Sequence, residues 1–175
     1  MSSLLGLDNE DTSSADRRSE VEQEQLTATA KSGASWFYWI AGLSAINSIA
    51  YMSGSSLSFL AGLGFTQLAA ALVDVAIDNG APDALKIVAI VFNFFLVALF
   101  AFIGYYANKR FSVAFVIGIV IYLLDGLLLL LLGELFGAAF HAFALFFIIR
   151  GFLACRTFNS QTQPNSLIST PPPAV

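Results

Sequence analysis

The sequence predicts an all-α integral membrane protein: a four-span transmembrane helical bundle with one additional amphipathic or re-entrant helix on the outer side. Three observations lead to this prediction. Hydrophobic residues make up 57% of the 175 residues and charged residues only 11%, against roughly 25% charged residues in soluble domains. The mean hydropathy is +0.76. The apolar residues also gather in segments close to the roughly 20 residues that cross a bilayer.

Polar segments flank the apolar part of the chain. Residues 1–31 are polar and acidic and are expected to form a disordered or loosely helical cytoplasmic tail. They lack the basic region and apolar core of a signal peptide, so the first membrane helix is expected to act as the insertion signal. Residues 157–175 end in a run of prolines and predict a flexible tail. The transmembrane domain is therefore expected over residues 32–156.

Four apolar segments have the length and composition of membrane spans. They are residues 36–53, 82–107, 111–132 and 135–155. Trp36, Tyr38 and Trp39 stand at one end of the first segment, where aromatic residues mark the membrane interface. Tyr105 and Tyr106 do the same for the second segment, which supports its assignment as a span.

Residues 59–78 are apolar enough to form a fifth span, but they carry a polar stripe. Gln67, Asp74 and Asp78 recur at helical spacing on one side, opposite an apolar side. This amphipathic pattern favours a helix that lies at the outer surface or re-enters the bundle. Gln67 and Asp74 are then candidates to line a cavity on that side.

The basic residues support the four-span topology. With both termini cytoplasmic, every Lys and Arg except Lys86 falls on or near the cytoplasmic side, as the positive-inside rule requires. Five spans would divide the eight basic residues equally between the two sides. The expected location is therefore a membrane, and the chain has the general look of a small bacterial inner (plasma) membrane protein.

Two titratable residues lie in the apolar sequence of the last two spans. The turn between these spans centres on Gly133, with Asp125 eight residues before it and His141 eight after it. Because a helix rises about 1.5 Å per residue, both side chains are expected at a similar depth, roughly 10 Å below the outer surface. Asn93 in the second span and Asn47 in the first are expected near the same depth. We therefore predict one polar layer that contains these four side chains.

This polar layer supports two interpretations. A charged side chain at the bilayer centre costs about 2.5–3.5 kcal/mol on insertion scales, so Asp125 and His141 are expected to face the bundle interior. As a structural network, the layer would select one packing of the helices through interhelical hydrogen bonds. As a functional site, it would be a proton-linked or ion-linked pair in a small transporter or channel element. The structural interpretation is favoured, because one Asp and one His are few groups for a transport pathway.

The remaining motifs give little support to catalysis. A single histidine excludes a two-His metal site within one chain, and the single Cys155 excludes an internal disulfide. An intramembrane enzyme is a third interpretation, but no serine is singled out as a nucleophile. Basic patches suited to nucleic acid are also absent.

The sequence therefore predicts a structural or accessory membrane subunit without enzymatic activity, cofactor or metal. Its expected partner is the lipid bilayer. Gly133 and Gly137 form a G-x-x-x-G motif, which favours close helix packing within the chain over dimerisation. A second copy of the chain or another membrane protein stays an additional candidate partner.

Overall fold

The structure is a computed structural model that describes the backbone of residues 2–52 and 63–162, and the side chains of 16–50 and 63–162. Five α-helices make up this part of the chain. They are α1 (Ser2–Met52), α2 (Gly64–Asp78), α3 (Leu85–Asn108), α4 (Ser112–Leu131) and α5 (Leu135–Thr162). The predicted all-helical class is confirmed for the described residues. The flexible tail predicted beyond residue 162 lies outside them.

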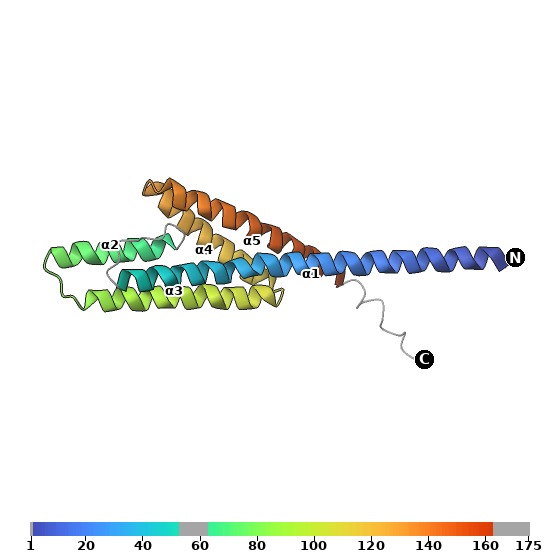
Figure 1. Cartoon of the computed structure of the whole chain (residues 1–175), viewed down its shortest axis with the longest axis horizontal. Helices are drawn as coiled ribbons and strands as arrows, with labels where there is room; N and C mark the ends of the chain where they lie inside the picture. The colour runs from blue at the N-terminus through green and yellow to red at the C-terminus, as the bar shows by residue number, and fades with distance from the viewer. Residues whose placement is uncertain (1, 53–62, 163–175) are drawn as a thin grey trace, which may run out of the picture.

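Helix α1 is far longer than a membrane span. Its 51 residues extend for about 76 Å, against a hydrocarbon thickness of about 30 Å. Its N-terminal half leaves the bundle as a single helix (Figure 1). Residues 2–31, predicted as a disordered or loosely helical tail, are helical in α1, and residues 19–31 are rich in the helix formers Glu, Gln, Leu and Ala. Glu22 also accepts a hydrogen bond from the Gln161 side chain at 3.2 Å, which joins this half of α1 to the end of α5.

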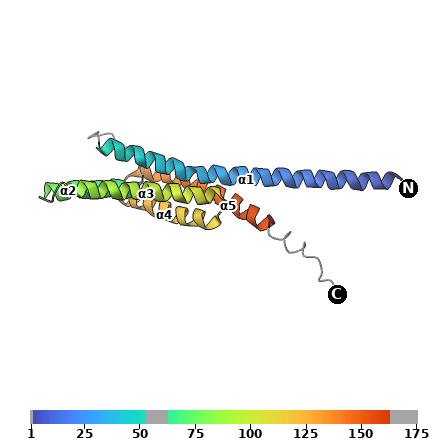
Figure 2. The same ribbon diagram turned by 90° about the horizontal axis from the view of Figure 1, so that it is seen from below.

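Four helices form a closed ring around the core. Helix α1 packs against α3 and α5, and α4 packs against the same two helices. Helices α3, α4 and α5 follow one another through short turns, so α4 runs antiparallel to both α3 and α5 (Figures 1 and 2). Gly133 makes the sharp α4–α5 turn with a positive φ of 81°, a conformation that glycine adopts without strain.

The phenyl ring of Phe37 forms the centre of the core. It is fully buried, and its centroid lies 6.3 Å from that of Phe100 on α3 and 6.0 Å from that of Phe115 on α4. Two glycines make room for it. A Cβ atom on Gly118 would lie 2.4 Å from the Phe37 ring, and one on Gly104 would lie 3.1 Å from the Phe37 Cβ. Small residues on α3 and α4 therefore admit one large residue from α1.

Helix α2 is too short to cross a bilayer. Its 15 residues extend for about 22 Å. It begins beside α4, packs against α3 and α4, and extends past the α4–α5 turn (Figure 1). Gly64 and Thr66 at its start are buried, whereas Asp74 and Asp78 are exposed. The helix predicted over residues 59–78 thus has its described part at 64–78, and residues 59–62 lie outside the described residues.

Three helices are long and apolar enough to cross a membrane: α3, α4 and α5. Helix α3 begins at Leu85 rather than near residue 82, and α4 matches its predicted segment to within one residue at each end. Helix α5 continues to Thr162, past the predicted end near residue 155. The first predicted span, residues 36–53, is not among the three. Its described residues lie in the C-terminal half of α1, so the four-span arrangement stays a prediction.

Candidate functional site

The buried start of α2 needs hydrogen-bond acceptors from other helices. The first backbone N–H groups of a helix have no partner within that helix. At α2 these groups are shielded from solvent, because Leu63 is 0% exposed and Thr66 is 5% exposed. Leu63 occupies the N-cap position, where its apolar side chain makes no capping hydrogen bond. Ser, Thr, Asp or Asn usually supplies the acceptor at that position.

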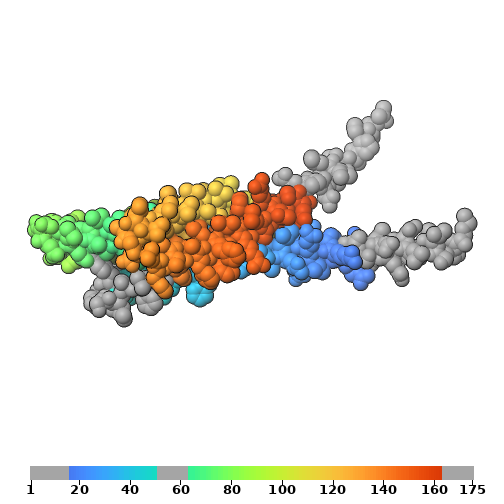
Figure 3. All heavy atoms as spheres, turned by 90° about the horizontal axis from the view of Figure 1, so that it is seen from above, coloured from blue at the N-terminus to red at the C-terminus, as the bar shows by residue number. Residues whose placement is uncertain are grey.

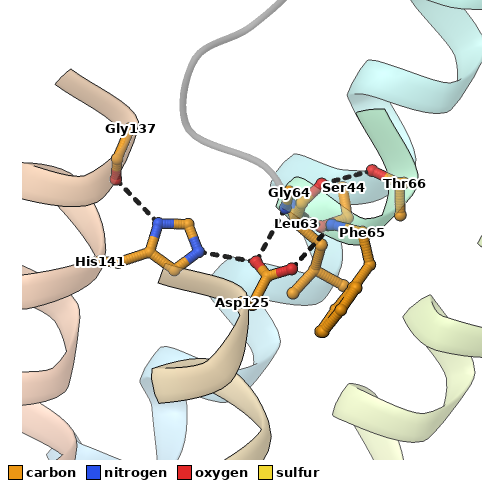
Figure 4. A network of polar contacts seen from close by, with 8 residues as sticks. All are labelled: Ser44, Leu63, Gly64, Phe65, Thr66, Asp125, Gly137 and His141. Carbon is orange, nitrogen blue, oxygen red and sulfur yellow. Dashed lines mark hydrogen bonds and ion pairs between the residues drawn. The ribbon is translucent and has the colours of Figure 1, made fainter. Parts of the chain in front are cut away.

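Asp125 on α4 supplies two of the missing acceptors. Its Oδ2 atom accepts a hydrogen bond from the Gly64 N–H at 2.8 Å, and its Oδ1 atom accepts one from the Phe65 N–H at 2.7 Å (Figure 4). Ser44 on α1 supplies the third, since its Oγ accepts from the Leu63 N–H at 3.2 Å. Two helices of the bundle thus cap α2 jointly, through side chains far from it in the sequence.

The charge of Asp125 complements the end of α2. A helix N-terminus carries the equivalent of about half a positive charge, so a carboxylate is favoured there. The close approach of α2 to α4 depends on Gly64. A Cβ atom at that position would lie 2.7 Å from the Leu129 Cγ and 3.4 Å from the Asp125 carbonyl oxygen. Glycine at the first position of α2 therefore lets the backbone N–H groups reach the carboxylate.

His141 on α5 completes the network. Its Nε2 atom lies 2.8 Å from Asp125 Oδ2, and the two side chains are 1% and 0% exposed. Its Nδ1 atom lies 2.8 Å from the Gly137 carbonyl oxygen. A carbonyl oxygen only accepts, so Nδ1 carries a proton. One further proton lies between Nε2 and Oδ2. This shared proton gives a direct hydrogen bond between the two side chains, whichever of them carries it.

Tight packing holds the imidazole in place. The Tyr122 ring stacks on it with centroids 4.2 Å apart and an interplanar angle of 19°. On α4, Gly126 allows the close approach, since a Cβ atom there would lie 2.9 Å from the His141 Cβ. Tyr122 is itself 1% exposed. Its hydroxyl oxygen is buried and has no hydrogen-bond partner among the described residues.

The structure brings together part of the predicted polar layer. Asp125 and His141 are paired, as the hairpin about Gly133 predicts. The hydrogen bonds drawn in Figure 4 reach neither Asn47 nor Asn93. Asn93 on α3 is half-buried, and its Oδ1 atom has no hydrogen-bond partner within the described part of the chain. The hairpin predicts one pair, but the assumed ends of the first two spans do not determine which way the asparagines face.

The two candidate cavity residues lie along α2, away from Asp125. Gln67 is half-buried and Asp74 is exposed. Helix α2 begins at the carboxylate and extends outward, so Asp74, ten residues beyond Gly64, lies about 15 Å farther along the axis. The prediction that both residues line a cavity therefore stays untested.

Sequence reasoning missed Ser44, Gly64 and the backbone N–H groups as parts of the site. Neither Ser44 nor Gly64 belongs to the predicted polar layer. One signal was present: α2 begins after Leu63, without a capping side chain of its own. A helix start that is both apolar and buried requires an acceptor elsewhere. Asp125, in the second apolar segment after α2, is that acceptor.

The arrangement favours an anchoring role over acid–base chemistry. Both oxygens of Asp125 and both nitrogens of His141 are engaged by groups of the protein itself. A solute would reach the carboxylate only by displacing α2. No protein-family model, curated protein or solved structure matches the chain. Fold and site together define a helical bundle with three apolar helices of membrane-spanning length, in which a buried Asp–His pair caps a half-length helix.

Proposed function

We propose that this chain is a multi-pass membrane protein without catalytic activity, a structural or accessory subunit in which Asp125 and His141 anchor α2 within the bundle. The observation that carries the proposal is that both oxygens of Asp125 are engaged by groups of the protein itself. A fully buried carboxylate accepts from two backbone N–H groups of α2 and from His141. The carboxylate of a transport or catalytic acid must reach a substrate or water. The oxygens of Asp125 instead accept hydrogen bonds that hold α2 and α5 in place.

The proposed topology has four spans and both termini in the cytoplasm. The fourth span is the C-terminal half of α1. Its inward side chains, Phe37 and Ile40, are at most 1% exposed within the bundle. Its outward side chains are also apolar, with Trp39 65% exposed and Ile49 61% exposed. A helix that is apolar on both its packed and its outer side suits lipid surroundings.

Charge at the two ends of the bundle supports this orientation. The N-terminal half of α1, the α3–α4 turn and the C-terminus of α5 lie toward the same end (Figure 1). Lys109 and Arg110 are in that turn, and Arg156 is near the end of α5. Tyr105 raises the pKa of Lys109 through a side-chain hydrogen bond, so the amine is charged at neutral pH. Lys86, at the start of α3, lies toward the opposite end.

A small transporter or channel element is the alternative. Two buried polar atoms favour it: the Tyr122 hydroxyl and the Asn93 Oδ1 have no hydrogen-bond partner among the described residues. Buried polar groups without partners carry a free-energy cost, which a bound solute or water would relieve. The two functions differ in water access. In an anchored bundle, no water reaches the level of Asn93 and Tyr122, whereas a transport site opens to water on at least one side.

Thiol labelling in intact membranes tests topology and water access together. In a Cys155→Ser background, single cysteines are placed at Asn93, at Gly80 in the α2–α3 turn and at Lys109 in the α3–α4 turn. An impermeant maleimide added from outside is expected to label position 80, and to label position 109 only after the membrane is permeabilised. Position 93 is expected to stay unlabelled in both conditions. Labelling of position 93 from outside would instead support the transporter element.

A further inference from the structure

Helices α1 and α5 cross in direct backbone contact. A Cβ atom built on Gly33 would lie 2.5 Å from the Gly151 Cα, and one built on Gly151 would lie 2.6 Å from the Gly33 Cα. The two glycines therefore allow an approach that no other residue pair permits. Figure 3 shows α1, in blue, next to the orange and red end of α5. This crossing lies at the end of the bundle that the proposed topology assigns to the cytoplasmic side.

A hollow of about 300 Å³ lies at this crossing. It is lined by Ala28, Thr29, Ser32 and Gly33 of α1 and by Phe147 and Arg150 of α5. Helix α1 contributes two hydroxyl groups to this lining, and α5 contributes the guanidinium of Arg150. The aromatic ring of Phe147 also comes from α5. Acidic side chains are absent from this lining, so the local charge is positive.

The polar groups of the hollow are unused within the described part of the chain. Arg150 forms no ion pair there. The hydroxyl groups of Thr29 and Ser32 make no hydrogen bond with a described residue, whereas Ser35 and Ser48 donate to backbone carbonyl oxygens one turn back in the helix. The lining thus presents a guanidinium fork and two hydroxyl donors that bond to no described residue, with Arg150 and Ser32 exposed at the surface.

An aromatic surface continues from the hollow along the bundle. Phe147 stacks on Trp36 with centroids 5.1 Å apart and an interplanar angle of 17°. Phe143 and Phe146 adjoin Phe147, and they are 54% and 62% exposed. These residues precede Arg150 on α5, so the surface extends from the guanidinium toward the middle of the proposed span.

We propose that this hollow binds the phosphate group of an anionic phospholipid of the cytoplasmic leaflet, with the acyl chains against Phe143, Phe146 and Phe147. Arginine binds phosphate oxygens in a bidentate geometry, and the hydroxyl groups of Thr29 and Ser32 donate to the same oxygens. The order of the groups matches a phospholipid: phosphate at the membrane surface and hydrocarbon below it. The proposal rests on the four-span arrangement, which places Arg150 at the level of the headgroups.

Fluorescence quenching of Trp36 measures this binding directly. The chain has two tryptophans, so Trp39→Phe leaves Trp36, which stacks on the lining residue Phe147, as the sole reporter. The full-length variant is reconstituted in phosphatidylcholine bilayers that contain either phosphatidylglycerol or phosphatidylcholine with brominated acyl chains. Brominated phosphatidylglycerol is expected to quench Trp36 at lower mole fraction. Arg150→Gln is expected to reduce this preference about fivefold, the contribution of one basic residue near an anionic surface.

Matched variants distinguish specific binding in the hollow from a general attraction of anionic lipid to surface charge. Arg156→Gln removes the same charge from α5 outside the hollow and is expected to retain the preference. Ser32→Ala is expected to reduce it while leaving the net charge unchanged. Equal quenching by the two lipids, or equal effects of Arg150→Gln and Arg156→Gln, would overturn the proposal.

Inorganic phosphate distinguishes a lipid headgroup from a soluble anion. In bilayers of phosphatidylcholine alone, phosphate is compared with chloride at the same ionic strength. No difference in Trp36 emission is expected. A saturating response to phosphate would assign the hollow to a soluble phosphate compound and overturn the lipid assignment. These outcomes do not depend on labelling at position 93, so this proposal and the proposed function fail separately.

Discussion

The Oδ2 atom of Asp125 accepts a hydrogen bond of 2.8 Å from the backbone N–H of Gly64, across 61 positions of the sequence. This contact joins the middle of one apolar helix to the first residue of another. It explains why a carboxylate lies in such apolar sequence, since the carboxylate replaces the capping residue that α2 lacks. The predictions that follow treat Asp125 as the anchor of α2.

Replacing Asp125 by asparagine is expected to destabilise the protein by about 3–5 kcal/mol, because an amide offers one acceptor where the site presents three donors. The amide of the new side chain would also bring its own N–H groups toward those donors. Urea or heat unfolding in detergent micelles, followed by circular dichroism, measures the change. Glu134→Gln, at the exposed α4–α5 turn, is the control and is expected to leave the free energy of unfolding unchanged. Wild-type stability of Asp125→Asn would contradict the anchoring role.

Replacing His141 by glutamine is expected to lower the free energy of unfolding less than replacing it by leucine. Glutamine keeps an N–H donor that can reach Asp125, whereas leucine leaves a buried carboxylate without this donor and costs about 3–5 kcal/mol. The free energies of unfolding of both variants are compared under the same detergent conditions. Equal losses would mean that the shape of the imidazole, stacked on Tyr122, matters more than its hydrogen bond to Asp125.

Gly64→Ala is expected to weaken the docking of α2, because its Cβ would lie 2.7 Å from the Leu129 Cγ. Overpacking of this kind costs about 1–3 kcal/mol. Hydrogen exchange of the first amides of α2, measured by mass spectrometry, is expected to accelerate. Leu129→Ala in the same chain is expected to slow it again.

Gly42→Ala is the matched control for the substitution at Gly64. Gly42 is also helical, and a Cβ atom there would meet no heavy atom within 4 Å. Alanine at this exposed helical position is expected to leave the exchange of α2 unchanged and to stabilise α1 slightly. Faster exchange in both variants would mean that the exchange rate of α2 reports general loosening of the bundle rather than the contact between residue 64 and Leu129.

Tyr122→Phe is expected to leave stability unchanged or to raise it slightly. The ring stacked on His141 is retained, and the variant removes a buried hydroxyl oxygen without a hydrogen-bond partner among the described residues. Removing a buried polar group that lacks a partner is close to neutral or favourable. Thermal unfolding measures the effect. A loss of more than about 1 kcal/mol, the typical net worth of a hydrogen bond, would indicate that the hydroxyl group binds water or a solute in the folded protein.

Most of the helical architecture is predictable from local patterns. Long apolar segments, separated by a short polar turn near Lys109 and by Gly133, predict α3, α4 and α5 with ends close to those observed. The pairing of Asp125 with His141 follows from the same local information, because the two residues are equidistant from the turn between antiparallel helices. For the N-terminal half of α1, the sequence left disorder and loose helix open, since its polar composition resembles that of disordered tails.

The sequence by itself determined the helical class, the apolar helices and the Asp–His pair, because each depends on hydrophobic periodicity or on the geometry of a single hairpin. Only the tertiary structure decided what the pair does. The donors that Asp125 receives are backbone N–H groups, and every residue except proline carries one, so no side-chain pattern marks them. Their position depends on how deeply α2 enters the bundle beside α3 and α4. That depth is set by the packing of Gly64 against Leu129, a contact between segments that are distant in the sequence.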